Sequence, residues 1–345
     1  MQALLALLVL CLALTDGFIS HGASSWRIGS SRLRAAEQTP AIPPRKALFF
    51  EIVESGLKDR FEPSDIERVF KFCSYAKGEL AMPFIDKSSQ HEPCEEYIEG
   101  LTARPWWSTS ASAEFNKWVP ALQEAAGIIR SELDNVLAQD ELSTFKADSN
   151  YQQTMGAGWT AFRLQRLGEW NQPNTERFPL TTRLLQSLDI PLAVRGVMFA
   201  KQNPNSGVQP HSDGRNFILT AHLGLTVPEG CSITCAGEKR EWKEGEVVIF
   251  DTSYTHSTEN RNADKARFVL IVDFWHPDLS QAERDALAWI YDARNKFESG
   301  RAKDIDCSWV KQGKPLTTQA YTDSQRGFGD KVVAFFSDGG LIKYR

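Results

Sequence analysis

Two histidines and one aspartate of this chain have the types and spacing of a metal site. His211 and Asp213 are two residues apart, so on an extended strand both side chains point to the same side while Ser212 points away. His256 follows the apolar run 247–250, where a later strand or its connecting loop can return to the first pair. Two histidines and a carboxylate hold mononuclear non-haem iron(II) on one face and leave the opposite positions open for a co-substrate and O2.

Arg267 adds a second chemical function to this group. It opens the segment ARFVLIVDFW, which is predicted to be the next strand. A guanidinium there can hold a dicarboxylate through paired hydrogen bonds, and beside iron(II) that dicarboxylate is predicted to be 2-oxoglutarate. The competing interpretations are a loop histidine next to a solvated aspartate and an ordinary cation at a strand edge. The second histidine and the arginine, on successive predicted strands, favour the metal site.

Short β-rich runs separated by turn residues are predicted to position these side chains. Turn residues lie at 203–205, 228–230 and 244–245. The predicted strands are 196–200, 217–226, 232–235, 247–251 and 268–275. Many short strands at this spacing favour a sandwich or jelly roll, the architecture of cupin-type barrels.

The run FILTAHLGLT, residues 217–226, alternates between two faces. Leu219, Ala221 and Leu223 form the more apolar face, and His222 lies on the other. His222 therefore suits the ligand-lined interior of a barrel. A histidine hydrogen-bonded to a backbone carbonyl is the alternative interpretation.

Helices are predicted on both sides of the β-rich region. Ser64 and Glu67 form one capping box, and Ser280 and Glu283 form another. Between them a longer helix is predicted from one apolar stripe, Phe115, Trp118, Leu122, Ile129, Leu133 and Val136. We expect these helices to pack on the outside of the barrel.

Composition excludes several classes of function. An apolar share of 42% in 345 residues is ample for one large domain or two small ones. A net charge of -5 without an extended basic run argues against nucleic acid as the main partner. There is no Walker loop, no GxSxG motif and no pair of CxxC motifs. Cys231 and Cys235, on one strand, are predicted to lie about 13 Å apart, too far for a disulfide.

Residues 1–40 are predicted to be a targeting presequence. The apolar run 4–14 is too short to span a bilayer comfortably and resembles the hydrophobic core of a signal peptide. Residues 17–34 are rich in Ser and Arg and lack acidic residues, as transit peptides do. We expect entry into the secretory pathway, followed by delivery to a secondary plastid, or else retention in the endoplasmic reticulum or secretion. No stable membrane span is expected in the mature chain.

From residue 158 to 277 the chain resembles the aspartyl/asparaginyl β-hydroxylase family of iron(II)- and 2-oxoglutarate-dependent dioxygenases. The matching segments, in order, are GWTAF, RGVMFAKQNPNSGVQPHSD, HLGLTVPEGC, EWKEGEVVIFDTSYTHSTEN and VDFWHP. The resemblance implies a double-stranded β-helix in which His211 and His256 bind iron. It also implies that Arg267 binds the distal carboxylate of 2-oxoglutarate and that His222 binds the other end.

Two departures from the family pattern concern this site. Animal members lack a carboxylate at the position of Asp213, whereas this chain has the complete His-x-Asp. Those members also use a serine and a second arginine to hold the co-substrate, and the corresponding positions here are Ala200 and Thr220. Thr220 is therefore the residue expected beside the co-substrate at the second position.

The sequence thus predicts a mainly β protein with flanking helices, and one catalytic unit. The predicted parts are a presequence (1–40), a helical N-terminal region (41–155), a double-stranded β-helix hydroxylase domain (156–277) and a C-terminal helix with a tail of unassigned role (278–345). The predicted activity is hydroxylation of an unactivated carbon, using iron(II), 2-oxoglutarate and O2.

The substrate remains open at this stage. The resemblance favours the β-carbon of Asp or Asn in a protein or peptide, and similar lipid acyl-chain hydroxylases leave a lipid substrate possible. A non-catalytic β-barrel binding module is a second hypothesis. A cupin-type metal enzyme that uses no 2-oxoglutarate is a third.

Overall fold

The computed structural model describes residues 44–80, 96–145, 155–156, 158–301 and 305. The predicted presequence and almost all of the C-terminal tail lie outside these residues. All of the described residues belong to one compact unit. The boundaries predicted at residues 155 and 277 fall inside it, and they remain predictions.

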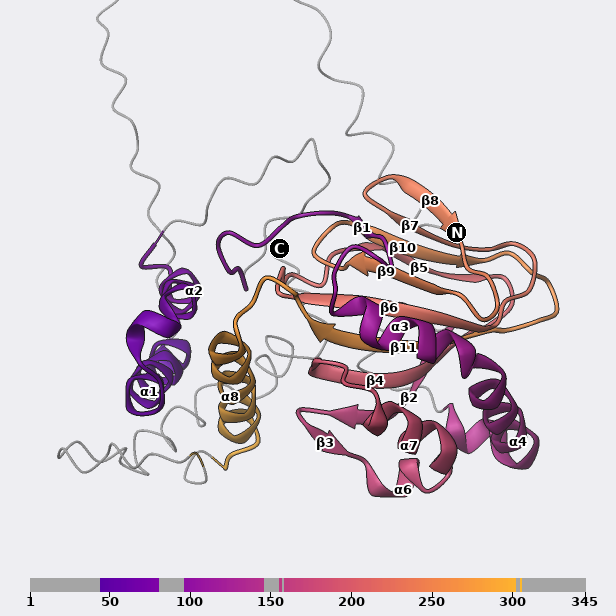
Figure 1. Ribbon diagram of the computed structural model, residues 1–345, viewed down its shortest axis with the longest axis horizontal. Helices are drawn as coiled ribbons and strands as arrows, with labels where there is room; N and C mark the ends of the chain where they lie inside the picture. The colour runs from indigo at the N-terminus through magenta and orange to yellow at the C-terminus, as the bar shows by residue number, and fades with distance from the viewer. Residues whose placement is uncertain (1–43, 81–95, 146–154, 157, 302–304, 306–345) are drawn as a thin grey trace, which may run out of the picture. The chain divides into compact units, whose positions relative to one another are not determined.

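Two antiparallel sheets face each other and form the centre of the unit (Figure 1). The seven-stranded sheet has the order β1 (Trp106–Trp107), β9 (Val247–Asp251), β6 (Ile218–Thr226), β11 (Arg267–Trp275), β4 (Leu192–Gln202), β2 (Trp159–Arg166) and β3 (Glu169–Trp170). The four-stranded sheet has the order β5 (Ser206–His211), β10 (His256–Asn260), β7 (Cys231–Cys235) and β8 (Glu238–Glu241).

The chain from β4 to β11 passes back and forth between these sheets. Strands β4, β6, β9 and β11 belong to the larger sheet, and β5, β7, β8 and β10 belong to the smaller one. This winding is a double-stranded β-helix, as predicted. All five predicted strands are present: β9 has the predicted bounds, and the bounds of the other four differ from the prediction by at most four residues. Strands β5, β8 and β10 were not predicted as runs, because their sequences are short and polar (SGVQPH, EKRE and HSTEN).

Apolar side chains fill the space between the two sheets, and other apolar side chains cover the outer face of the larger sheet. The interior cluster includes Met198, Ala200, Val208, Ile233, Trp242, Phe250, Val269 and Ile271. The outer cluster joins the larger sheet to α3 (Phe115–Glu124), α4 (Ala126–Thr144) and α7 (Pro179–Ser187). As predicted for 217–226, the side chains of Leu219, Ala221 and Leu223 all belong to this outer cluster.

A third apolar cluster covers one end of the larger sheet. It joins α1 (Pro44–Arg60), α2 (Glu67–Lys77) and α8 (Gln281–Glu298) to the ends of β4, β6 and β11. The predicted capping box of α8 is confirmed: Ser280 Oγ accepts from the Glu283 N–H at 3.2 Å, and Glu283 Oε2 accepts from the Ser280 N–H at 2.9 Å.

Two helix predictions were wrong in detail. The capping box at Ser64 and Glu67 does not form, because Pro63 starts a 3-10 turn (Pro63–Asp65) that contains Ser64. The predicted long helix is two helices, α3 and α4, which meet at Ala125. Pro120 and Gly127 flank this break, and they are the residue types that least favour a continuous helix. All six residues of the predicted stripe are nevertheless buried in the outer cluster.

Two further observations concern cysteines and membrane helices. Cys231 and Cys235 are both free and buried, so the prediction that they form no bridge with each other is confirmed. Within the described ranges, no helix combines the length and the apolar character needed to cross a bilayer.

Candidate metal and co-substrate site

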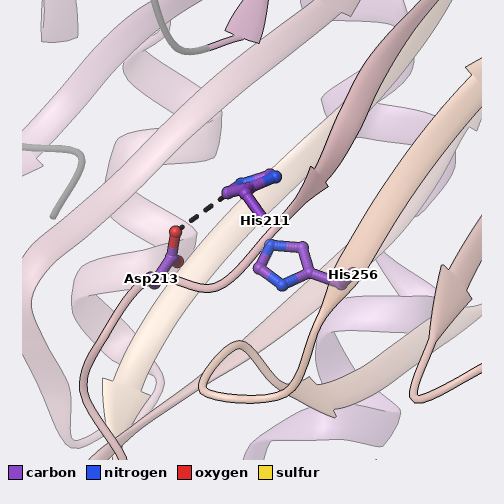
Figure 2. A group of neighbouring side chains, drawn as sticks. All are labelled: His211, Asp213 and His256. Atoms are coloured by element: carbon purple, nitrogen blue, oxygen red, sulfur yellow. Dashed lines mark ion pairs between the residues drawn. The ribbon is translucent and has the colours of Figure 1, made fainter. Parts of the chain in front are cut away.

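His211, Asp213 and His256 converge at one end of the smaller sheet (Figure 2). One ligand atom from each residue lies within 4.8 Å of the others. The His211 Nε2 atom is 3.8 Å from Asp213 Oδ1, and the two imidazole ring centres are 4.2 Å apart. In the described part of the chain, this is the one cluster of at least three potential metal-binding side chains. The predicted ligands are therefore close enough together to share one ion.

The backbone brings these ligands together in a way that differs partly from the prediction. His211 ends β5 and His256 begins β10, and the two are directly paired across these antiparallel strands. Asp213 was predicted on the same strand as His211, but β5 ends at His211 and Asp213 lies in the following loop. Hydrogen bonds fix this loop: the Asp213 N–H donates to Thr252 O at 2.9 Å, and Ser212 Oγ donates to Ser253 O at 2.8 Å.

The backbone also orients both imidazole rings. Nδ1 of His211 donates to the Gln209 carbonyl at 2.8 Å, and Nδ1 of His256 donates to the Tyr254 carbonyl at 2.9 Å. A proton held on Nδ1 leaves the Nε2 lone pair free, and such a bond commonly orients a metal-binding histidine. In both rings Nε2 is therefore the nitrogen available to a divalent cation.

Burial and nearby charges set the protonation of the ligands. Burial lowers the pKa of His256 to about 4, with His211 contributing to the decrease, so His256 is neutral at pH 7. Burial alone would raise the pKa of Asp213, but the Arg195 charge, assisted by the two histidines, holds it well below its usual range. A neutral imidazole and an ionised carboxylate are the forms that ligate a metal.

Arg267 lies in the interior between the sheets, with 1% of its surface exposed. Its guanidinium carbon is 4.4 Å from the ring centre of Trp242. Three residues here have buried nitrogens without a hydrogen-bond partner in the structure: Arg267 (Nε and Nη1), His222 (Nδ1) and Trp242 (Nε1). Buried donors normally have partners, so this group fits an anionic ligand with several acceptor oxygens.

The structure bears on one of the two interpretations of His222, the hydrogen bond to a backbone carbonyl; its predicted role in binding the co-substrate remains a prediction. Its side chain lies in the interior, as predicted, and its Nδ1 donates to no carbonyl. The ring stacks on Trp242 with centres 5.9 Å apart and contacts Phe250 at 5.0 Å. Phe250 in turn lies 5.7 Å from His256. A continuous series of ring contacts therefore joins Arg267 to His256, one of the candidate metal ligands.

Thr220 and Ala200, the positions that depart from the family pattern, are both buried. Ala200 belongs to the interior cluster. The Thr220 hydroxyl donates to Asp273 Oδ1 at 2.6 Å. Its predicted contact with the co-substrate remains a prediction.

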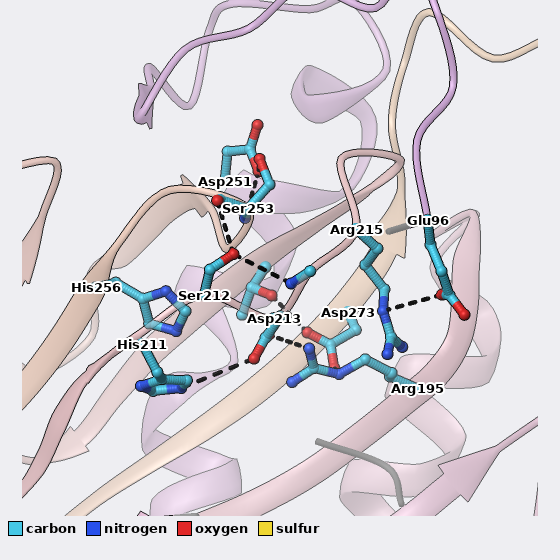
Figure 3. A network of polar contacts seen from close by, with 12 residues as sticks. Glu96, Arg195, His211, Ser212, Asp213, Arg215, Asp251, Ser253, His256 and Asp273 are labelled. Carbon is cyan, nitrogen blue, oxygen red and sulfur yellow. Dashed lines mark hydrogen bonds and ion pairs between the residues drawn. The ribbon is translucent and has the colours of Figure 1, made fainter. Parts of the chain in front are cut away.

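Sequence reasoning assigned no role to Arg195, Trp242 or Asp273. Figure 3 shows Arg195 beside both Asp213 and Asp273. Trp242 lies under Arg267, although 25 residues separate them in the sequence. All three residues lie within segments that carry the family resemblance, but no local pattern marks them.

Comparisons with known proteins agree with this geometry. A family model described as "Aspartyl/Asparaginyl beta-hydroxylase" matches residues 123–277, which include all the candidate ligands. The chain is 33% identical over 193 residues to the aspartyl/asparaginyl beta-hydroxylase of Mus musculus, a match that covers 55% of this chain and 26% of that protein.

Two other relatives are also similar. The chain is 33% identical over 171 residues to the ornithine lipid ester-linked acyl 2-hydroxylase of Rhizobium tropici, covering 48% of this chain and 59% of that protein. It is 30% identical over 218 residues to aspartate beta-hydroxylase domain-containing protein 2 of Homo sapiens, covering 59% of this chain and 56% of that protein. The chain therefore spans between about a quarter and three fifths of the length of these relatives.

Proposed function

Because this chain belongs, over residues 123–277, to the aspartyl/asparaginyl β-hydroxylase family, we propose that it is an iron(II)- and 2-oxoglutarate-dependent dioxygenase that hydroxylates an unactivated carbon. The observation that carries the proposal is that a candidate cation site and a candidate anion site both lie in the interior of the same β-barrel. The triad offers three ligands for a cation, and Arg267 with its neighbours offers unpaired donors for an anion. A chelating dicarboxylate that contacts both would satisfy both.

The residues that would hold the metal are His211, Asp213 and His256. When bound, iron(II) would supply the reaction of O2 with 2-oxoglutarate, which gives succinate, CO2 and a hydroxylated product. The protein's part is to hold the three ligands on one side, keep the His256 imidazole neutral and anchor the co-substrate. Arg267 is suited to the distal carboxylate, since a guanidinium can donate two parallel hydrogen bonds to it.

The buried Arg267 nitrogens that lack a hydrogen-bond partner favour the dioxygenase over a simple binding module. A buried cation without an acceptor is costly, and a β-barrel with a purely structural metal does not need one. The same observation argues against a cupin-type enzyme that uses no 2-oxoglutarate. Both alternatives predict no succinate under any condition.

For the substrate, we propose the β-carbon of an Asp or Asn side chain in a protein or peptide, and the similarity to the Mus musculus enzyme supports it. The similarity to the acyl 2-hydroxylase of Rhizobium tropici favours a lipid acyl chain as the second candidate. Incubation with Asp- and Asn-containing peptides and, in parallel, with ornithine lipid distinguishes them. The readout is a mass increase of one oxygen atom in the product.

The decisive experiment measures succinate and CO2 from anaerobically purified, iron-loaded protein given 2-oxoglutarate and air. Turnover is expected in the wild type and is expected to be lost in the Arg267→Met and Asp213→Ala variants. Arg183→Met is the matched control, because Arg183 is an exposed arginine on α7. If the wild type binds neither iron nor 2-oxoglutarate, the dioxygenase proposal is wrong and the binding module is favoured.

For location, we propose that residues 1–40 direct the chain into the secretory pathway, with a plastid, the endoplasmic reticulum or the exterior as the destination. The Ser- and Arg-rich stretch after the apolar run supports a two-part presequence. Microscopy of a fluorescent protein fused to residues 1–40 tests this. A uniform cytosolic distribution would contradict it.

A further inference from the structure

Arg195 lies between two buried carboxylates on the interior side of the larger sheet (Figure 3). One guanidinium nitrogen, Nη1, donates to Asp213 Oδ2, and Nε lies 3.1 Å from Asp273 Oδ2. Asp273 is held from its other side by the Thr220 hydroxyl. Strands β4, β6 and β11 therefore each contribute one residue to a polar chain that ends on a predicted metal ligand.

An irregular backbone is needed to bring Arg195 to this side. On β11 Val272 and Phe274 are two residues apart, yet their partners on β4, Val197 and Leu192, are five residues apart. Side chains five apart on a regular strand point to opposite faces, but Val197 and Leu192 both pack against the outer, helix-covered cluster. The alternation of β4 side chains between the two faces of the sheet is therefore interrupted between Leu192 and Val197. A β-bulge has this effect, and it turns a side chain to the other face.

Gly196 permits this change of face. Its φ is +72°, a backbone conformation that favours glycine. A Cβ atom there would lie 2.2 Å from the Gln165 carbonyl oxygen on the neighbouring strand β2. The Arg195 carbonyl is held from the same strand, since it accepts from Arg163 Nη1 at 2.5 Å. The conformation of Gly196 therefore directs the Arg195 side chain to the interior.

We propose that Arg195 is a positioning residue, resting on the metal site proposed above: it occupies Oδ2 of Asp213 so that Oδ1 alone faces the metal. The geometry supports this division, because Oδ1 is the oxygen 3.8 Å from His211 Nε2, whereas Oδ2 receives the arginine. Arg195 also compensates the negative charge of the buried Asp213 carboxylate, since the two side chains form an ion pair. Asp273, in turn, fixes the arginine.

Cobalt(II) tests the proposal without turnover, since its visible spectrum reports the number and geometry of its ligands. The full-length protein is titrated with Co(II), and affinity and spectrum are recorded for the wild type, Arg195→Met, Arg195→Lys and Asp273→Asn. Loss of a residue that orients a metal ligand is expected to weaken metal binding about 10- to 100-fold. We expect that loss and an altered spectrum in Arg195→Met, and a smaller effect in Arg195→Lys, which keeps the charge but not both contacts.

A double-mutant cycle shows whether Arg195 acts through Asp213. In an Asp213→Ala background, Arg195→Met is expected to weaken Co(II) binding by less than about twofold, because the carboxylate it positions is gone. This double variant leaves no uncompensated charge from the pair, so it guards against loss of folding in the single variant. Far-UV circular dichroism and thermal unfolding verify the fold of each protein.

The possible results separate the positioning role from the metal site itself. Unchanged Co(II) affinity and spectrum in Arg195→Met, or an equal loss in both backgrounds, would overturn the positioning role while leaving the metal site in place. If the His256→Ala variant binds Co(II) as tightly as the wild type does, Co(II) does not bind at the triad. That outcome would refute the proposed metal site and the positioning role together.

Discussion

Replacing Arg267 by methionine is expected to stabilise the ligand-free protein and to abolish its response to 2-oxoglutarate. Burial lowers the pKa of Arg267 from 12.5 to about 10, which corresponds to about 3 kcal/mol of unfavourable free energy for the charged guanidinium in the folded state. The pKa of Arg267 is lower in the folded state than in the unfolded state, so below pH 10 the guanidinium is charged in both states and the full cost is present. The variant also loses the contact with Trp242, worth about 1 kcal/mol. The free energy of unfolding is therefore expected to rise by about 2 kcal/mol at pH 7.

The assay is urea unfolding at pH 7 in the presence of a chelator, repeated with Mn(II) and increasing 2-oxoglutarate. Mn(II) replaces iron so that no turnover consumes the co-substrate. A ligand that binds only the folded state raises its stability by about 2.7 kcal/mol at 100 times its dissociation constant. The wild type is expected to show this rise, and Arg267→Met is expected to show none. Arg267→Lys is the control that keeps a buried charge.

Two results would refute this reasoning. If ligand-free Arg267→Met is less stable than the wild type by several kcal/mol, the guanidinium has a structural role that outweighs its burial cost. If 2-oxoglutarate stabilises Arg267→Met as much as the wild type, the dicarboxylate binds elsewhere.

Three further predictions concern other parts of the molecule. Trp242→Leu removes the aromatic ring that contacts the Arg267 guanidinium. Since a cation–π contact contributes about 1 kcal/mol, this variant is expected to raise the dissociation constant of 2-oxoglutarate about fivefold. Titration with 2-oxoglutarate measures this constant, and an unchanged value would contradict the prediction. Burial raises the pKa of Asp251 from 3.8 to about 7, so the folded state keeps a proton that the unfolded state has lost, and stability is expected to fall as pH rises from about 4 to 7. Asp251→Asn should flatten this slope by up to about 1.4 kcal/mol per pH unit in urea unfolding, and an identical slope would count against it. Ser280→Ala breaks the capping box with Glu283 and is expected to lower the free energy of unfolding by about 1 kcal/mol; a loss below a few tenths would show that α8 does not depend on its cap.

Much of the fold was predictable because its determinants are local. Strands β4, β6, β9 and β11 contain long apolar runs, since the larger sheet is covered by helices on one side and by the smaller sheet on the other. Strands β5 and β10 have no such run, so they are defined only by pairing: β5 pairs with β10, and β10 also pairs with β7. The capping box of α8 formed where that of Ser64 did not, because a proline next to Ser64 starts a different turn.

The sequence by itself determined which residues are candidates for the chemistry, because the types and order of His211, Asp213, His256 and Arg267 can be read without coordinates. Only the tertiary structure decided how they are held. The loop position of Asp213 depends on a hydrogen bond to Thr252, and the contact between Arg267 and Trp242 depends on the closure of the barrel. The orientation of Arg195 depends on an odd register shift between β4 and β11, which reverses the face a side chain occupies. Such shifts and closures arise from pairing between distant segments, and no short window of sequence contains them.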